Sequence, residues 1–189
     1  TLGAEGNLYC FGVEKGDVIW SKDFKKEYGC NSALWGYANH PLVDGEKLIC
    51  VVGGEGSHTV AFNKLTGEEL WKCGTAKEQG YSPPTLVEFG GKRQLICCRP
   101  DAVVGIDVES GEQLWTTPYA ATNGSIIMSP VRSGDYLYIG GYSDKNLMLK
   151  LASDKPAVEV VFKDKVKVGV SPINVQPIVD NGVMYGIDQ

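Results

Sequence analysis

The chain carries one short pattern three times, and this repeat limits the fold more than any other feature. Each copy has an apolar strand, four variable residues, a glycine, an acidic residue, one further residue, an apolar residue and a tryptophan. The copies end at Trp20, Trp71 and Trp115, which lie 51 and 44 residues apart. A period of this length indicates one supersecondary unit repeated along the chain.

A second pattern runs in phase with the first. Leu42, Leu86, Val131 and Ile178 occupy equivalent positions, at steps of 44, 45 and 47 residues. Short apolar runs on either side of Asp-Gly or Ser-Gly-Asp turns predict β-hairpins. No stretch shows sustained helical periodicity with caps. Four short antiparallel strands in each unit predict the blades of a β-propeller.

We therefore predict an all-β fold of four-stranded antiparallel blades, with residues 1–189 forming a single β-propeller segment. The units fall at 1–35 (partial), 36–79, 80–124, 125–171 and 172–189 (partial), which is about four blades. Either four blades close on themselves by sharing one blade between the two ends, or the segment is an open arc of a larger ring. We favour the larger ring, and a piece of a longer chain, because an open arc leaves bare strand edges.

The repeated residues are predicted to be structural. Stacked blades need large apolar contacts, so the tryptophans are expected to pack between blades instead of clamping a ligand. The glycines supply the positive φ of a tight turn. In the fourth unit Val161 or Phe162 replaces the tryptophan and Pro156 interrupts the turn, so this blade is expected to be the least regular. The repeat anchors are Trp20, Trp71, Trp115, Gly16, Gly67 and Gly111.

Composition excludes several classes of protein. The net charge is −5 and the basic residues are scattered, whereas a nucleic-acid binder normally has a basic face. No run approaches eighteen apolar residues, so this segment has no predicted transmembrane helix. There is no C-x-x-C pair and there are only two histidines, so no metal site is predicted. A disulfide between Cys30 and Cys73 is left open.

One segment departs from the repeat and is the candidate binding loop. Trp20 and Pro41 are 21 residues apart, whereas their equivalents, Trp71 and Thr85, are 14 apart. Insertions in repeat arrays map to loops, often on the binding face. We predict a partner-binding loop that contains Tyr28, Trp35 and Tyr37, because exposed aromatic residues suit partner contact. The alternative is that Trp35 packs over the junction between two blades.

Several short motifs together resemble a known family. They are Trp35-Gly36-Tyr37, Gly53-Gly54, Thr66-Gly67 and the repeated strand-turn-tryptophan unit. They are similar to the quinoprotein-like (PQQ-repeat) β-propeller family, and closest to PQQ-binding-like repeat proteins of the bacterial exported type. The resemblance covers nearly the whole chain. It implies a ring of seven or eight blades and a periplasmic or secreted location.

The resemblance implies three functions. We expect a non-catalytic binding or scaffold module, with a protein partner or small ligand on a propeller face, no catalytic residues and no cofactor. The alternative is a PQQ- and Ca²⁺-dependent alcohol or sugar dehydrogenase. In that case the adjacent Cys97 and Cys98 would be the cofactor-binding residues, although Arg99 stands where that class has an aspartate. The third is a sensor domain of a membrane signalling protein.

Overall fold

The computed structural model describes residues 1–165 and 170–188, which form an all-β fold of successive antiparallel sheets. Three sheets have four strands each and two have two strands. The five sheets follow one another in the order of the chain. We number them blades 1 to 5. The fourth predicted unit, 125–171, includes residues 166–169, which lie outside the described residues. The prediction of four-stranded propeller blades is confirmed.

The blades have one topology, in which each strand pairs with the next along the chain. Blade 1 is β1 (Asn7–Phe11) and β2 (Val18–Asp23). Blade 2 is β3 (Leu42–Asp44), β4 (Lys47–Val51), β5 (Thr59–Asn63) and β6 (Glu69–Cys73). Blade 3 is β7 (Thr85–Phe89), β8 (Lys92–Cys98), β9 (Ala102–Asp107) and β10 (Gln113–Pro118). Blade 4 is β11 (Val131–Ser133), β12 (Tyr136–Gly141), β13 (Lys145–Leu151) and β14 (Val158–Lys163), and blade 5 is β15 (Ile178–Asp180) and β16 (Val183–Tyr185).

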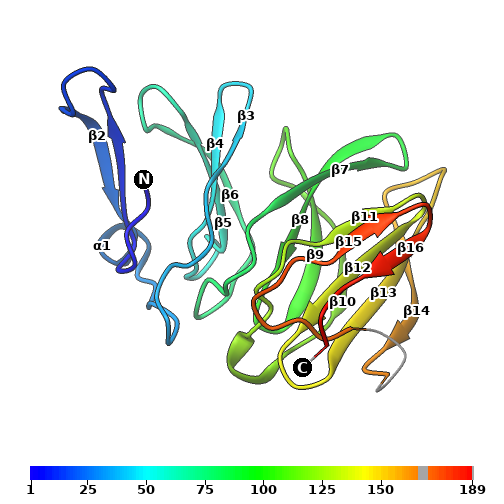
Figure 1. The fold of residues 1–189 in the computed structure, drawn as a ribbon. Coiled ribbons are helices and arrows are strands. Elements are labelled where there is room, and N and C mark those ends of the chain that lie inside the picture. Colours follow the sequence, from blue (N-terminus) through cyan, green and yellow to red (C-terminus); the bar gives the residue numbers. More distant parts are fainter. Residues whose placement is uncertain (166–169, 189) are drawn as a thin grey trace.

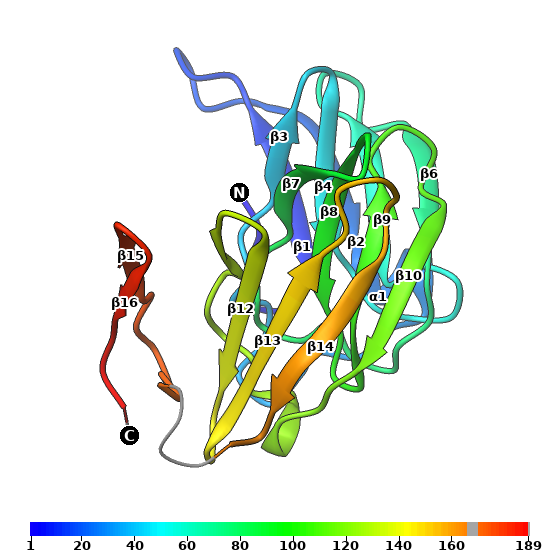
Figure 2. The ribbon, with the colours of Figure 1, turned by 90° about the vertical axis from the view of Figure 1, so that its right-hand side faces the viewer.

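The blades stand side by side as an open arc (Figure 1). Blade 1 lies at one end of the arc, and blade 5 lies at the other end against blade 4, where β15 contacts β11 (Figure 2). Among the described strands, neither β15 nor β16 pairs with β1 or β2. The described part of the chain is therefore not a closed four-bladed ring.

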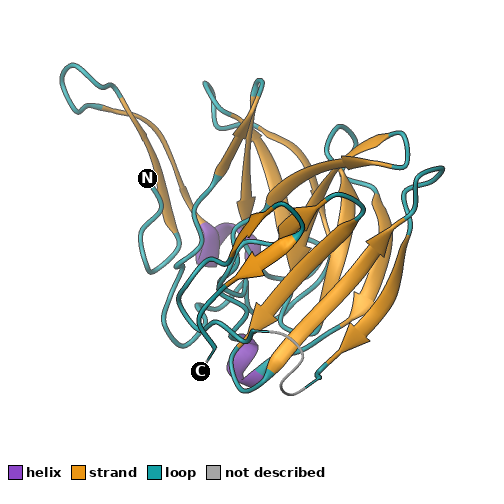
Figure 3. Cartoon of the chain, turned by 45° about the vertical axis from the view of Figure 1, so that its right-hand side comes forward, coloured by secondary structure: helices purple, strands orange, loops and turns teal. Residues whose placement is uncertain are grey.

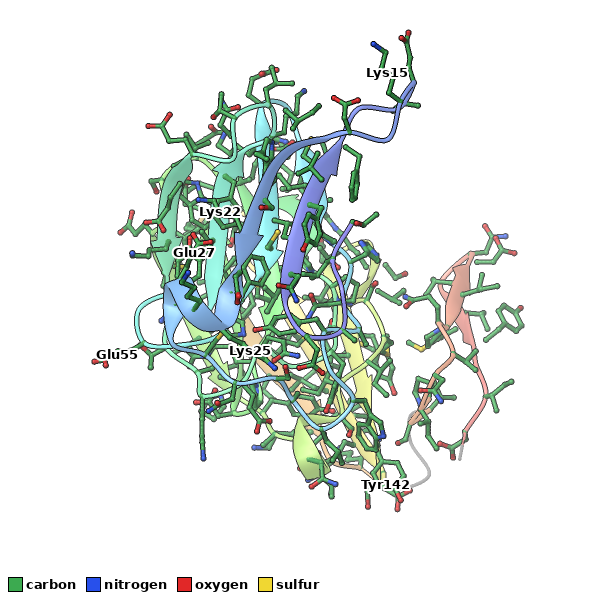
Figure 4. All side chains as sticks on the ribbon, turned by 90° about the vertical axis from the view of Figure 1, so that its left-hand side faces the viewer. Lys15, Lys22, Lys25, Glu27, Glu55 and Tyr142 are labelled. Carbon is green, nitrogen blue, oxygen red and sulfur yellow. The ribbon has the colours of Figure 1, made fainter. Side chains whose placement is uncertain are left out.

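Antiparallel pairing gives every blade two different ends. The turns β3–β4 and β5–β6, with their equivalents, lie at what we call the hairpin end. The connections between blades and the turns between second and third strands lie at the loop end, where both short helical segments are found (Figure 3). Lys15 marks the hairpin end in Figure 4, and Glu55 and Tyr142 mark the loop end.

Neither of these helical segments was predicted from the sequence. Helix α1 (Phe24–Tyr28) begins after Asp23, whose carboxylate accepts a hydrogen bond from the Lys26 amide, and ends at Gly29 in the left-handed region, φ 63°. An aspartate before the helix and a glycine after it are ordinary cap signals. The helix is too short to show a helical period, which is why the pattern search missed it.

The core is divided between the junctions of the blades. Neighbouring residues of one strand face opposite junctions, so Leu95 packs toward blade 2 and Ile96 packs toward blade 4. Both are fully buried. Strands buried on both faces read as continuous apolar runs, and this explains the sequences of β4, β8 and β12.

Two repeat tryptophans pack on the turn glycine of the following blade. A Cβ atom on Gly67 would lie 2.8 Å from the Trp20 ring, and one on Gly111 would lie 2.7 Å from the Trp71 ring. Both glycines have positive φ, 74° and 76°. The repeat glycine therefore serves its own turn and also leaves room for the indole of the preceding blade.

The third tryptophan behaves differently. Trp115 lies over Gly105 of its own blade, and its Nε1 donates to Gln94 Oε1 at 2.8 Å. It packs against the cluster between blades 3 and 4, but the β13–β14 turn of blade 4, equivalent to the turns of Gly67 and Gly111, contains no glycine. The repeat thus has one sequence and two modes of packing.

Blade 4 is more regular than the sequence suggested. Its four strands are paired as in blades 2 and 3. The last strand has a β-bulge at the same place, directly before the tryptophan position. Phe162 pairs with Met148, as Trp71 pairs with Ala61, so Phe162 takes the tryptophan position. The turn differs: the Ala152 amide donates to the Ala157 carbonyl as in the other blades, but the second bond of this turn runs from the Ala157 amide to the Lys155 carbonyl.

Candidate functional site

A pocket of about 650 Å³ opens at the loop end of the arc. It is formed by all four connections between blades and by the turn between β12 and β13. Pockets of 300–1,000 Å³ are the usual size for small-molecule sites. Its lining residues are Trp35, Ala38, Tyr81, Asn123, Ser125, Ile127, Tyr142, Ile173 and Asn174.

Aromatic side chains form both the floor and the rim of this loop-end pocket. Tyr81 is 3% exposed and lies at the base, where its hydroxyl accepts a hydrogen bond from the Trp35 amide at 3.3 Å. The rings of Trp35 and Tyr81 are tilted by 55°, with their centroids 5.6 Å apart. Trp35 is 59% exposed and Tyr142 is 42% exposed, so both stand at the mouth. A ligand in the pocket would therefore contact aromatic faces.

The described polar groups of the pocket carry no charge. Among the described residues, the lining contains Asn123, Asn174 and Ser125, but no lysine, arginine, histidine or carboxylate side chain. The side chains of Asn123 and Asn174 make no hydrogen bond to another described residue. Two amide groups are thus available to a ligand, each with donors and an acceptor.

The predicted binding loop is divided by the structure. Trp35 lies at the pocket mouth, as described above. Tyr37 does not reach the surface: it is 5% exposed, and its hydroxyl donates to the Val52 carbonyl at 2.7 Å. The expectation that Tyr37 contacts a partner is therefore corrected. Tyr28 is half-buried against Phe62, and its hydroxyl bonds to Glu69 at 2.9 Å, so it holds the insertion on blade 2.

The insertion is anchored by its own thiol. Cys30 is buried, and its Sγ lies 3.0 Å from the Tyr37 hydroxyl and 3.2 Å from the Phe24 carbonyl. Cys73 packs in a different cluster, between blades 2 and 3. Both cysteines are free thiols in the structure. The Cys30–Cys73 disulfide, which the sequence left open, is absent.

Cys97 and Cys98 are adjacent in β8, but their side chains lie on opposite faces of the sheet. Cys97 packs toward blade 2 and Cys98 toward blade 4. Both are free, and neither lines the loop-end pocket. Burial raises the pKa of both thiols, to about 12 for Cys98. A protonated thiol is a poor nucleophile and metal ligand, so these two side chains have the properties of core residues.

The described residues do not fit a PQQ and Ca²⁺ pair. PQQ is a tricarboxylate, and the described residues of the pocket lining include no cationic side chain that could pair with its carboxylates. Ca²⁺ takes six to eight oxygen ligands, usually with several carboxylates among them, and residues 1–165 and 170–188 contain no cluster of three His, Cys, Asp or Glu side chains that could hold a metal ion. No step of quinone chemistry can be assigned to these side chains.

One buried histidine lies outside the pocket. His58 is 1% exposed, and its Nε2 lies 3.2 Å from the Gln79 carbonyl and its Nδ1 3.1 Å from the Thr59 hydroxyl. Burial lowers the pKa of His58 to about 4. It is therefore neutral near pH 7 and links β5 to the connection between blades 2 and 3.

The chain matches one protein family over nearly its whole length. The family described as outer membrane protein assembly factor BamB matches residues 1–188. The chain belongs to this BamB family. Nothing among the curated proteins matches it. The helices in the described part of the chain are all too short to cross a membrane.

Solved structures to which the chain is similar include a BamB protein and two alcohol-oxidising dehydrogenases. BamB from Moraxella catarrhalis is 16% identical, with 100% of this chain and 68% of that chain covered, at a TM-score of 0.47. Quinohemoprotein alcohol dehydrogenase ADHIIG from Pseudomonas putida HK5 is 14% identical, with 97% and 36% covered, at 0.55. A europium-containing methanol dehydrogenase is 11% identical, with 80% and 37% covered, at 0.52. The chain thus spans little more than a third of either enzyme, and these likenesses concern the fold alone.

Most of the pocket was missed by sequence reasoning, although the repeat contained a signal for it. Ala38, Ile127 and Asn174 are equivalent positions, 89 and then 47 residues apart, and all three line the pocket. Only Trp35 was singled out, because it is the tryptophan outside the repeat. Reading the connections between blades as a second repeated unit would have identified these three residues together.

Proposed function

We propose that this BamB-family chain is a non-catalytic, extracytoplasmic binding or scaffold module that holds its partner at the loop end. The observation that carries the proposal is the loop-end pocket, to which all four connections between blades contribute. Loops held by a rigid β scaffold are the usual place for binding residues. The extracytoplasmic location rests on the description of the family as an outer membrane assembly factor.

The absence of activating groups in the pocket supports binding over catalysis. A nucleophile or general base needs a perturbed pKa and a partner within hydrogen-bond reach. The lining offers hydroxyl, amide and aromatic groups without an adjacent base. Neutral aromatic pockets suit recognition of a partner or ligand, because Trp and Tyr contribute large contact areas at low entropic cost.

Site-specific photo-crosslinking in the native envelope tests the proposal. A benzophenone side chain placed at Ala38, which is exposed and lines the pocket, is expected to give a discrete adduct with a partner. The matched control is Leu65, exposed at the hairpin end. The same adduct from both positions, or none from Ala38, would contradict binding at the loop end.

A calorimetric titration of the intact protein with PQQ and Ca²⁺ tests the alternative that the protein is a PQQ-dependent dehydrogenase. We expect no saturable heat, because the described lining has no cation to meet the cofactor carboxylates. Saturable one-to-one binding, followed by PQQ-dependent oxidation of an alcohol with a dye acceptor, would replace the proposal with a dehydrogenase.

A further inference from the structure

We propose that the loop-end pocket binds a neutral saccharide through ring stacking and amide hydrogen bonds. The inference rests on the proposed function, since it names the ligand of the same site. It depends on three observations: the aromatic faces at the mouth, the unused amides beside them, and the lack of charge in the lining.

The aromatic faces suit a pyranose ring. Trp35 and Tyr142 are exposed residues of the pocket lining, and the buried ring of Tyr81 lies beside the indole, with the two centroids 5.6 Å apart. The face of an aromatic ring carries partial negative charge, so it attracts the weakly positive C–H groups on one face of a sugar. The Trp35 amide donates a hydrogen bond to the Tyr81 hydroxyl. This bond fixes the backbone that carries the indole.

The amides suit hydroxyl groups. Asn123 and Asn174 come from different connections between blades and have no hydrogen-bond partner among the described residues. Each amide can donate to one hydroxyl and accept from its neighbour. Asn123 has a φ of 54°, in the left-handed region that asparagine tolerates better than most residues. The two side chains therefore place complementary donors and acceptors beside the aromatic surface.

The lack of charge excludes other ligand classes. Nucleotides and phosphosugars need cationic groups or helix termini to hold their phosphates, and the described residues of the lining include no cationic side chain. A purely apolar ligand would leave the asparagines unpaired or force them out of water. An extended peptide bound by β-addition needs an open strand edge, whereas the lining consists of connections and one turn. A neutral, hydroxylated ring satisfies all of these groups.

Titration of the intact protein with methyl glucoside and methyl glucuronide, followed by cellobiose, maltose and N,N′-diacetylchitobiose, tests this inference. The first two share a ring and differ by one carboxylate. We expect at least one neutral sugar to shift the tryptophan fluorescence saturably, with a Kd of about 1 mM or below. We also expect the glucuronide to bind at least tenfold more weakly than the glucoside. Saturation-transfer NMR gives a second readout that does not depend on fluorescence.

Three variants test whether the sugar binds at Trp35 in the loop-end pocket. Trp35→Ala is expected to weaken binding at least tenfold, and Trp35→Phe to retain binding by NMR while losing the fluorescence shift. Phe11→Ala is the matched control, because Phe11 is also an exposed aromatic residue but lies on β1, away from the pocket. Unchanged binding in Trp35→Ala, or equal loss in Phe11→Ala, would overturn the assignment.

The outcomes distinguish the two proposals. If no neutral sugar binds up to about 10 mM, tenfold above the expected Kd, the saccharide inference fails. The binding module stands if the Ala38 crosslink still yields a protein adduct. If there is neither sugar binding nor a crosslink, both proposals fail. Tighter binding of the glucuronide than of the glucoside would overturn the argument from charge.

Discussion

The junctions on the two sides of blade 3 are built differently. Between blades 2 and 3, the Trp71 indole packs on Gly111, and its Nε1 is buried without a hydrogen-bond partner in the described residues. Between blades 3 and 4 there is no such pair. There, Gly90 of the β7–β8 turn lies directly against the backbone of Lys155 and Pro156.

The difference shows that a tryptophan on a glycine is one solution to blade packing and not a requirement. The junction of blades 3 and 4 compensates with a long apolar cluster that includes Ile139, Leu147 and Leu149, all fully buried. Arg132 adds a hydrogen bond across this junction to the Glu88 carbonyl at 2.6 Å. For packing between blades, the shape and area of the buried surface matter more than the repeated tryptophan and glycine. A unit can therefore lose these two residues and still form a blade.

The largest effect is expected from removing the indole between blades 2 and 3. Trp71→Ala should lower the free energy of unfolding by about 3 kcal/mol, the low end of the range for a large aromatic residue in a core, because Trp71 is only partly buried. Gly111→Ala alone adds left-handed strain and a clash with the ring. In the Trp71→Ala background only the strain remains, so the two changes should couple by about 1–3 kcal/mol. Urea denaturation of the double-mutant cycle measures this, and strict additivity would contradict the packing.

A matched pair of glycines tests the same contact between blades 1 and 2. Gly67 and Gly16 have similar φ values, 74° and 71°, but only Gly67 meets a ring, and nothing lies within 4 Å of Gly16. We expect Gly67→Ala to cost about 3 kcal/mol, the sum of left-handed strain and overpacking. Gly16→Ala should cost about 1 kcal/mol from strain alone. Equal losses in urea denaturation would show that the turn matters and the indole does not.

The buried histidine should make blade 2 sensitive to acid. The pKa of His58 is about 4 in the folded chain and near 6.5 when exposed, so below pH 6.5 the unfolded state binds the proton first. Stability is therefore complete above pH 6.5 and is lost as the pH falls toward 4, by about 2 kcal/mol at pH 5. Blade 3 has Ala102 at the equivalent position and should lack this response.

Urea denaturation as a function of pH measures the effect of His58. His58→Gln should flatten the profile between pH 6.5 and 4, whereas His40→Gln, at an exposed histidine, should leave it unchanged. A wild-type profile that stays level over this range would show that His58 takes up its proton without unfolding.

The smallest effect is expected from the ion pairs at the hairpin end between blades 2 and 3. Arg93 Nη2 lies 2.6 Å from Asp44, and Lys47 Nζ lies 2.6 Å from Glu109. The Arg93 and Glu109 side chains are largely exposed, and exposed pairs contribute little. Arg93→Ala should lower Tm slightly in dilute buffer and not at all near 1 M salt, where the Debye length is about 3 Å. A loss that persists in salt would mean that the arginine stem packs between the blades.

Several features of the fold followed from local patterns. The apolar alternation and turn residues predicted the strands of blades 2, 3 and 4, because side-chain direction in a strand has a period of two. The turn glycines fell where positive φ was expected. The sequence could not show that Trp115 would pack within its own blade, because Gln94 and Gly105, its contacts, lie elsewhere in the chain.

The candidate site was predicted only in part, for a physical reason. Trp35 stood out because it broke the repeat, but Tyr37, two residues away, is buried and Tyr28 faces blade 2. Neighbouring residues of a connection turn toward different surroundings, and those surroundings belong to other blades. Sequence spacing does not report them.

By itself the sequence determined a repeated antiparallel blade, since strand period, turn chemistry and the spacing of Trp20, Trp71 and Trp115 are local or periodic properties. The pocket was decided only by the tertiary structure. Trp35, Tyr81 and Asn174 come from three different connections between blades and Tyr142 from a turn of blade 4, up to 139 residues apart, and all four line one cavity. They meet because each blade packs on the last through its buried strands, and this packing brings the connections between blades together at one end of the arc.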